Sequence, residues 1–373
     1  MSNRSYNIII VGGGVIGLSI ARALALRGVN DICLLERSSL GTEASYAAAG
    51  MLAPQAEADS RDEFFDLLCQ SRDLYPEFAA ALKEETGVDI ELDQTGTLYL
   101  AFNEHDQAEI NRRFEWQTRA GLSVEQMTSS DARLLEANIA SNVSGALLFP
   151  KDYQVENRRL LNALVNSVAQ LNVSLRTGIN VEGICIQKNH VTGVRTLEEK
   201  LDCETVILAA GSWTSLIHST VKVEPVRGQM VCLNTKPQLS RHVIYSPRGY
   251  IVPRQDGRLL AGSTSERAGF VKEVTVKAVT SILQNAIEIC PAVATLPIAD
   301  LWSGLRPKAS DGLPVLGPCG EIDGLIYATG HYRNGILLAP ITGELIAKTI
   351  VEDNLQPALA PFSPDRFSSL VVS

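Results

Sequence analysis

A glycine-rich turn between an apolar segment and a helix lies near the start of the chain. The apolar run 7–11 leads into residues 12–17, Gly-Gly-Gly-Val-Ile-Gly, which fit the pattern G-x-G-x-x-G. Gly12 permits a tight turn, Gly14 lets the backbone approach a pyrophosphate, and Gly17 lets the helix lie close to its strand. The N–H groups at the start of such a helix face an anion. The turn therefore predicts a dinucleotide site.

The residues after this turn support the same interpretation. A second apolar run, 32–35, ends in Glu36, at the distance of about 20 residues where an acid takes the ribose hydroxyls. The alternative is a glycine-rich turn in an ordinary α/β unit. The order strand, glycines, helix, strand and acid favours the dinucleotide site.

Length and charge limit the class of protein. A chain of 373 residues exceeds one comfortable core, so we expect two domains. The net charge is −9 and no basic block is present, which argues against a nucleic-acid partner. Residues 1–6 lack the features of a signal peptide, and no apolar stretch is long enough to span a bilayer. We therefore expect no membrane partner. The seven cysteines form no C-x-x-C, so we expect no metal site, and reduced thiols of this kind indicate a cytoplasmic location.

Strand patterns far from the first turn predict that the nucleotide domain is assembled from separate segments. The run 204–210 ends at Gly211, and the run 325–329 is followed by the turn 330–335 and a helix at 336–351. Ligands of open α/β sheets bind at such strand ends. We predict a nucleotide domain built from residues 1–85, 142–220 and 301–373.

The remaining segments, 86–141 and 221–300, predict a substrate domain. Its expected strands are 96–102, 229–233, 249–253 and 259–262, and the last three have no helix between them, so they should be antiparallel. A helix is expected at 276–289. An amphipathic helix with apolar positions between 64 and 82 is expected to be interrupted near Pro76.

Several motifs together make the chain similar to the glycine oxidases of the D-amino-acid oxidase superfamily, the flavoenzymes of the thiamine pathway. The motifs are residues 12–17, 45–52, 250–254, 302–307 with 311–314, and 330–340. The first and fourth are shared across the superfamily, whereas 45–52 and 330–340 discriminate more. The implied fold is an α/β FAD-binding Rossmann-type domain of the glutathione-reductase kind, interleaved with an α+β substrate domain on an antiparallel sheet.

The resemblance implies noncovalent FAD. Sarcosine oxidases of the superfamily bind FAD to a cysteine shortly after the arginine clamp, whereas Cys319 lies well beyond it here. The turn before helix 336–351 offers N–H groups to the electron-rich reduced ring. The small residues 47–50 would let the chain lie against that ring, although a helix interior is the alternative. The expected cofactor residues are Gly12, Gly14, Val15, Ile16, Gly17, Glu36, Arg37, Ala44, Ser45, Ala49, Gly50, Met51, Val181, Gly211, His331, Tyr332, Arg333, Asn334, Gly335, Ile336 and Leu337.

Four residues are expected at the substrate: Arg306, Tyr250, Arg333 and Met51. Arg306 can hold a carboxylate with two parallel hydrogen bonds; its alternative is a surface salt bridge. The alternative for Tyr250 is a half-buried strand tyrosine, and that for Arg333 is pairing with an acidic neighbour. His331 is not assigned as a base, because the reaction needs none if the amine enters unprotonated.

The implied reaction is oxidative deamination of glycine by hydride transfer from the α-carbon to flavin N5, with oxygen as the acceptor. The products would be glyoxylate, ammonia and hydrogen peroxide. Sarcosine and small D-amino acids are further expected substrates. Family members are often tetramers, so we expect a homo-oligomer.

Three alternatives remain open at this point. A D-amino-acid dehydrogenase would pass electrons to a membrane quinone, but no basic amphipathic anchor is visible. A flavin-dependent RNA-modifying enzyme is opposed by the acidic charge. A nucleotide-binding protein without activity would leave Tyr250, Arg306 and Arg333 without a joint purpose.

Overall fold

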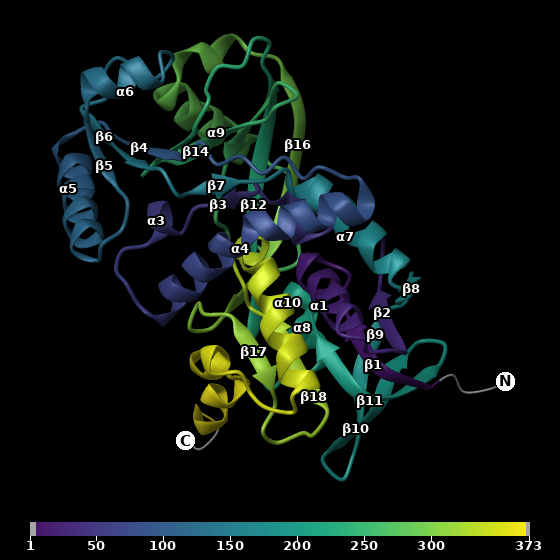
Figure 1. Cartoon of the computed structure of the whole chain (residues 1–373). Helices are drawn as coiled ribbons and strands as arrows, with labels where there is room; N and C mark the ends of the chain where they lie inside the picture. The colour runs from purple at the N-terminus through teal and green to yellow at the C-terminus, as the bar shows by residue number, and fades with distance from the viewer. Residues whose placement is uncertain (1–4, 371–373) are drawn as a thin grey trace.

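Two sheets of eight strands each organise the described part of the protein. Figure 1 draws the computed structural model. The structure describes residues 5–370. Residues 1–4 and 371–373 lie outside the described part. The two ends of the predicted nucleotide domain therefore lie outside it, as do most of residues 1–6, on which the prediction about a signal peptide rests. Within residues 5–370, no helix has the length and apolar character needed to cross a membrane.

The first sheet has the order β17-β18-β11-β1-β2-β8, and β9 and β10 extend it from β11. The pairs of β1 with β2 and β11, β2 with β8, and β11 with β18 are parallel. Its strands are β1 (Ser5–Val11), β2 (Ile32–Glu36), β8 (Ser174–Thr177), β9 (Val181–Gln187), β10 (His190–Thr196), β11 (Lys200–Leu208), β17 (Val315–Pro318) and β18 (Leu325–Thr329).

Both faces of this sheet are covered, which explains the unbroken apolar run of β1. Ile8 and Ile10 pack into the helical layer, whereas Ile9 and Val11 pack into the layer that β9 and β10 help to form. Helices α1, α4, α7 and α10 make the helical layer, where α1 and α10 lie side by side (Figure 1). The helices within residues 5–370 are α1 (Val15–Leu26), α2 (Ala44–Ala47), α3 (Pro54–Glu57), α4 (Glu63–Thr86), α5 (Glu104–Arg119), α6 (Ser129–Leu135), α7 (Asn157–Gln170), α8 (Thr214–Ile217), α9 (Val276–Ile289) and α10 (Gly335–Val351); the 3-10 segments are η1 (Gly211–Trp213), η2 (Pro291–Thr295), η3 (Pro357–Phe362) and η4 (Pro364–Leu370).

The second sheet has the order β16-β12-β15-β14-β13-β4-β6-β5. The expected antiparallel pairing of β12, β14 and β15 is confirmed, while β4 pairs parallel with β13. Strand alternation divides its faces: Val231 and Ile251 pack in the cluster that contains α9, whereas Met230 and Tyr250 face the other way. The strands are β4 (Thr97–Ala101), β5 (Glu125–Thr128), β6 (Gly145–Phe149), β12 (Val223–Asn234), β13 (Val243–Ser246), β14 (Gly249–Pro253), β15 (Arg258–Gly262) and β16 (Ile298–Ala309); β3 (Met51–Leu52) and β7 (Tyr153–Gln154) form a small separate pair.

Two details differ from the sequence-based expectations. Helix α4 is not interrupted near Pro76 but continues through it, because Tyr75 and Leu82 are anchored in the core on either side. Strand β6 and most of β16 fall in segments predicted for the nucleotide domain, yet both pair within the second sheet. The division of the chain into domains stays a prediction.

Candidate active site

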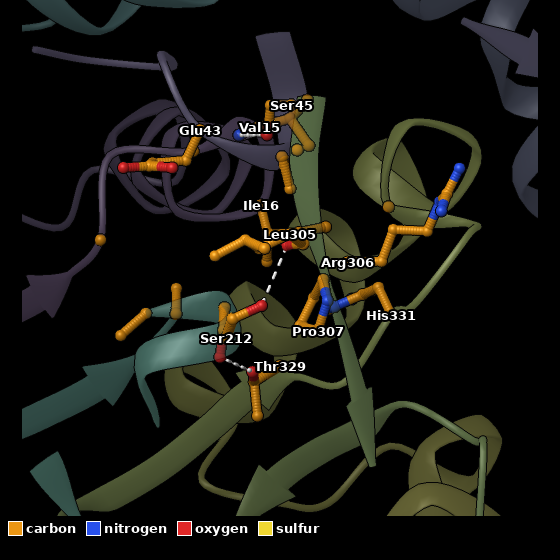
Figure 2. Close-up of a pocket in the computed structure, with 18 of the residues that line it drawn as sticks. Val15, Ile16, Glu43, Ser45, Ser212, Leu305, Arg306, Pro307, Thr329 and His331 are labelled. Atoms are coloured by element: carbon orange, nitrogen blue, oxygen red, sulfur yellow. Dashed lines mark hydrogen bonds between the residues drawn. The ribbon is translucent and has the colours of Figure 1, made fainter. Parts of the chain in front are cut away.

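The carboxyl ends of the parallel strands meet beside one face of the second sheet. A cavity of about 460 Å³ lies there, and its wall combines the residues after β1, β2, β11 and β18 with residues of β12, β14 and β16. Two hydrogen bonds tie these regions together. The Ser212 hydroxyl donates to the Leu305 carbonyl at 2.9 Å, and that of Thr329 donates to the Gly211 carbonyl at 3.2 Å (Figure 2).

The glycine turn after β1 forms one end of the cavity. Gly12 has φ +113°, and a Cβ there would lie 2.4 Å from the carbonyl oxygen of Ala209. A Cβ at Gly17 would lie 2.0 Å from the carbonyl oxygen of Gly12, so this glycine allows close packing of helix and strand and does not line the cavity. At Gly14 the Ser45 hydroxyl, 3.2 Å from an added Cβ, is the nearest group. The backbone at Gly14 is thus open to a ligand.

The predicted acid, Glu36, is fixed at the wall by the backbone. Its two oxygens accept hydrogen bonds from the N–H groups of Gly13, at 2.8 Å, and Ser38, at 2.9 Å. A carboxylate has further lone pairs, so Glu36 can still accept bonds from ribose hydroxyls. Next to it, the Arg37 guanidinium lies 3.7 Å from the centre of the Trp213 ring and pairs with Glu43.

The small-residue segment after α2 runs along the cavity. The helix ends at Ala47, and Gly50 turns with φ +73°, so the helix-interior alternative is wrong for the later part of the run. Arg254, 3% exposed, donates to the carbonyls of Ala49 at 2.7 Å and Val155 at 2.8 Å. Burial lowers the pKa of Arg254 to about 10. This buried arginine holds the segment against the cavity.

The turn before α10 supplies another wall. Among residues 5–370, no side chain caps the helix at Asn334, so its first N–H groups are available to a ligand. His331 is buried, and its Nε2 lies 3.2 Å from the Thr342 hydroxyl. Burial lowers the pKa of His331 to about 3, so the ring is neutral and serves the packing. Leu337 lies in the core and does not line the cavity.

Arg306 lies on β16 at the opposite part of the wall (Figure 2). Its Nη1 donates to the Thr264 carbonyl at 3.0 Å, and its Nη2 donates to the Ser263 hydroxyl at 2.8 Å. A guanidinium has five N–H donors, so these bonds orient the group and leave donors for a carboxylate. The surface-salt-bridge alternative does not describe this residue.

Tyr250 and Arg333 approach the same region from other elements. The Tyr250 hydroxyl lies 3.4 Å from the Met230 sulfur. The Arg333 Nη2 donates to Glu57 at 2.8 Å and to the Tyr245 hydroxyl at 3.1 Å. The Glu57 carboxylate raises the pKa of Arg333 further above its ordinary value. The acidic partner that the sequence left open is thus Glu57.

All the predicted site residues except Gly17 and Leu337 line this one cavity, Met51 and Val181 included. Their contacts with a cofactor or substrate stay predictions. Sequence reasoning missed Glu57, Met230, Gly228, Ser263 and Thr264. Ser263 and Thr264 follow Gly262 after an apolar strand, which resembles an ordinary strand end, and Glu57 lies in an unremarkable acidic stretch. These three residues therefore carried no local signal of a site.

Comparisons with known proteins agree with this geometry. The family model described as FAD dependent oxidoreductase matches residues 7–349. Glycine oxidase of Geobacillus kaustophilus is 35% identical, over 97% of this chain and 97% of that protein. The crystal structure of glycine oxidase from Bacillus cereus has a TM-score of 0.91 and 36% identity, and the match covers 96% of this chain and 98% of that one.

A second kind of relative is longer than this chain. The bifunctional protein ThiO/ThiG of Synechocystis is 36% identical over 97% of this chain, but the match covers 54% of that protein. The chain therefore spans about half the length of this relative and nearly the whole length of the glycine oxidase.

Proposed function

Because the chain belongs to the family of FAD-dependent oxidoreductases, we propose that it oxidises glycine, and also sarcosine and small D-amino acids, to an imine that hydrolyses. The observation that carries this proposal is the position of Arg306 and Tyr250 in the same cavity as the glycine turn. A carboxylate clamp and a dinucleotide site that share one cavity suit the oxidation of a small amino acid.

The residues of the cavity fit FAD. The open backbone at Gly14, the uncapped first turn of α10 and the fixed carboxylate of Glu36 match a pyrophosphate, an electron-rich ring and a ribose. When bound, the flavin would accept the hydride at N5 and pass the electrons to oxygen.

The protein's own task is to place the substrate. The oriented Arg306 guanidinium would hold the carboxylate by two parallel bonds, and the Tyr250 hydroxyl would add a third. Fixing the α-carbon in this way converts an encounter into a unimolecular step. His331 is neutral and bonded to Thr342, so we propose that the substrate amine enters unprotonated.

The biological setting is part of the same proposal. Relatives that join ThiO and ThiG in one chain support the proposal that the product serves thiamine biosynthesis. We also propose a cytoplasmic homo-oligomer, such as a tetramer.

Anaerobic mixing of the purified protein with glycine, while flavin absorbance near 450 nm is followed, tests the function. Bleaching by glycine that is reversed by air, with peroxide formed, is expected. Reduction only by larger D-amino acids with slow reoxidation by oxygen would instead indicate a D-amino-acid dehydrogenase.

A further inference from the structure

A short segment links the cavity to a buried carboxylate outside it. The segment, residues 54–59, follows β3 and contains α3, whose last residue is Glu57. Glu57 lines the cavity and accepts the hydrogen bond of Arg333 at 2.8 Å. The position of this segment therefore decides whether the Arg333 charge is met by Glu57 or faces the cavity alone.

Asp152 holds the segment from behind. It is fully buried and does not line the cavity. Its Oδ1 accepts a hydrogen bond from the Gln55 N–H at 3.2 Å, and its Oδ2 accepts one from the Ala56 N–H at 3.0 Å. Gln55 and Ala56 directly precede Glu57 in α3, so the two bonds fix the backbone that carries the Glu57 side chain.

Other buried contacts also hold the segment 54–59, but they bind residues other than Glu57. The Gln55 and Gln117 side chains are fully buried, and Gln55 Nε2 donates to Gln117 Oε1 at 2.8 Å. Arg113 donates to the carbonyls of Ala56 at 3.1 Å and Ala58 at 2.7 Å. These contacts seat the segment on α5, whereas the N–H groups at its start bond to Asp152.

The charged groups around Asp152 come from α4 and from the segment itself. Arg72 attracts the carboxylate and Glu57 repels it, while Cys69 lies close enough to feel its charge. Arg72 donates mainly to Asp73, at 2.7 and 2.9 Å, so within the described part of the chain Asp152 has no ion-pair partner of its own. The contacts made by the Asp152 carboxylate are therefore its two hydrogen bonds from the backbone N–H groups of Gln55 and Ala56.

We propose that Asp152 is a positioning residue that holds Glu57 on Arg333 and thereby makes the cavity selective for monocarboxylates. With Arg333 neutralised by Glu57, Arg306 is left to bind one carboxylate, as glycine requires. A ligand with a second acidic group meets the Glu57 carboxylate and is repelled. This inference rests on the proposed function, because it assigns the substrate carboxylate to Arg306.

Two small anions test the idea with the FAD-loaded protein. Acetate carries one carboxylate and malonate two, and their dissociation constants are measured from the change in flavin absorbance near pH 8. We expect Glu57→Gln to tighten malonate relative to acetate by about tenfold, which corresponds to about 1.4 kcal/mol. Asp152→Asn should shift the same ratio in the same direction, because its amide presents a donor to one of the two backbone N–H groups.

The double variant shows whether Asp152 acts through Glu57. Asp152→Asn combined with Glu57→Gln should shift the ratio no further than Glu57→Gln alone. Glu136→Gln is the matched control: Glu136 is 4% exposed and accepts bonds from the N–H groups of Arg241, at 2.8 Å, and His242, at 2.7 Å, away from the cavity. The control should lower stability and leave the ratio unchanged.

Several results would overturn the inference. These are an unchanged ratio in Glu57→Gln or in Asp152→Asn, additive shifts in the double variant, or no binding of either anion to the wild-type protein. If Asp152→Asn does not fold, Asp152→Ser, which keeps one acceptor, takes its place. Anion binding needs no turnover, so a protein that fails to oxidise glycine disproves the proposed function without deciding this test.

Discussion

The Arg306 guanidinium lies directly against Gly228 of the neighbouring strand β12. A Cβ at position 228 would come within 2.1 Å of Nη1 and 2.4 Å of Cζ. The register places Arg306 opposite Val226, two residues away on β12. The missing side chain at position 228 therefore provides the space in which the guanidinium lies flat and reaches Ser263 and Thr264.

Gly228→Ala should displace this guanidinium without unfolding the sheet, since the obstructing atoms are the end of a flexible side chain. We expect the KM for glycine and the dissociation constant for acetate to rise at least tenfold, as steady-state kinetics and flavin titration would show. Gly145→Ala is the control: its Cβ would meet the end of Gln107 at 2.6 Å, on β6, away from the cavity. Equal effects of the two changes would contradict the assignment.

Arg306→Lys tests the geometry of the clamp rather than its charge. Lysine is a point charge and cannot make two parallel bonds, so we expect the glycine KM to rise about 100-fold, or roughly 2.7 kcal/mol, with a smaller fall in kcat. Arg176→Lys, in a pair with Glu199 outside the cavity wall, should change neither constant. A wild-type KM in Arg306→Lys would show that another cation binds the carboxylate.

Two glycines of the first turn should respond differently to alanine. Gly17→Ala places Cβ against backbone, 2.0 Å from the Gly12 oxygen, so helix α1 must move and the melting temperature should fall sharply. Gly14→Ala meets only the Ser45 hydroxyl, so the fold should persist while FAD binds at least tenfold more weakly. Thermal unfolding of the apoprotein and fluorescence titration with FAD measure the two effects. A Gly14→Ala protein with wild-type affinity would place the pyrophosphate elsewhere.

The sequence predicted the strand-end part of the site because its signals are local. The turn at residues 12–17 and the turn before α10 each follow an apolar strand directly, and parallel strands bring such ends together. Arg306, which lines the cavity, was also among the predicted residues, but the residues that contact its guanidinium were not. Gly228, Ser263 and Thr264 meet it only through the pairing of β12 and β16 and the loop after β15, which no short pattern encodes.

The same distinction explains the error at Pro76 and the pairing of β16. Pro76 was expected to interrupt α4 on local grounds, but the burial of Tyr75 and Leu82 against other elements keeps the helix intact. The predicted boundary at residue 301 places most of strand β16 in the nucleotide domain, although β16 pairs along its length with β12, and the division into domains stays a prediction. Tertiary packing decided both cases.

The flavin should be released by acid. Cys319 follows β17 and does not line the cavity, so it is not placed to bond the cofactor. Precipitation with trichloroacetic acid is expected to leave a colourless pellet and a yellow supernatant, measured by absorbance of both fractions. Colour that stays with the pellet would disprove noncovalent binding, and the Cys319→Ser variant would then show whether this thiol is the attachment point.

The charge of Asp152 should cost the protein stability at neutral pH. Burial raises the pKa of Asp152 to about 7. In the unfolded chain the group titrates near 4, so the folded state binds the proton more tightly, and stability falls as pH rises from about 4 to about 7. The free energy of unfolding of the wild type should decline over this range by a few kcal/mol more than that of Asp152→Asn, as urea denaturation at pH 5 and pH 8 would measure. Parallel pH dependence in the two proteins would show that Asp152 does not titrate there. Asp152 thus lowers the stability of the folded protein at neutral pH, yet its carboxylate accepts two hydrogen bonds from the turn before Glu57. The proposed role of Asp152, to hold Glu57 on Arg333, accounts for a buried carboxylate that destabilises the fold.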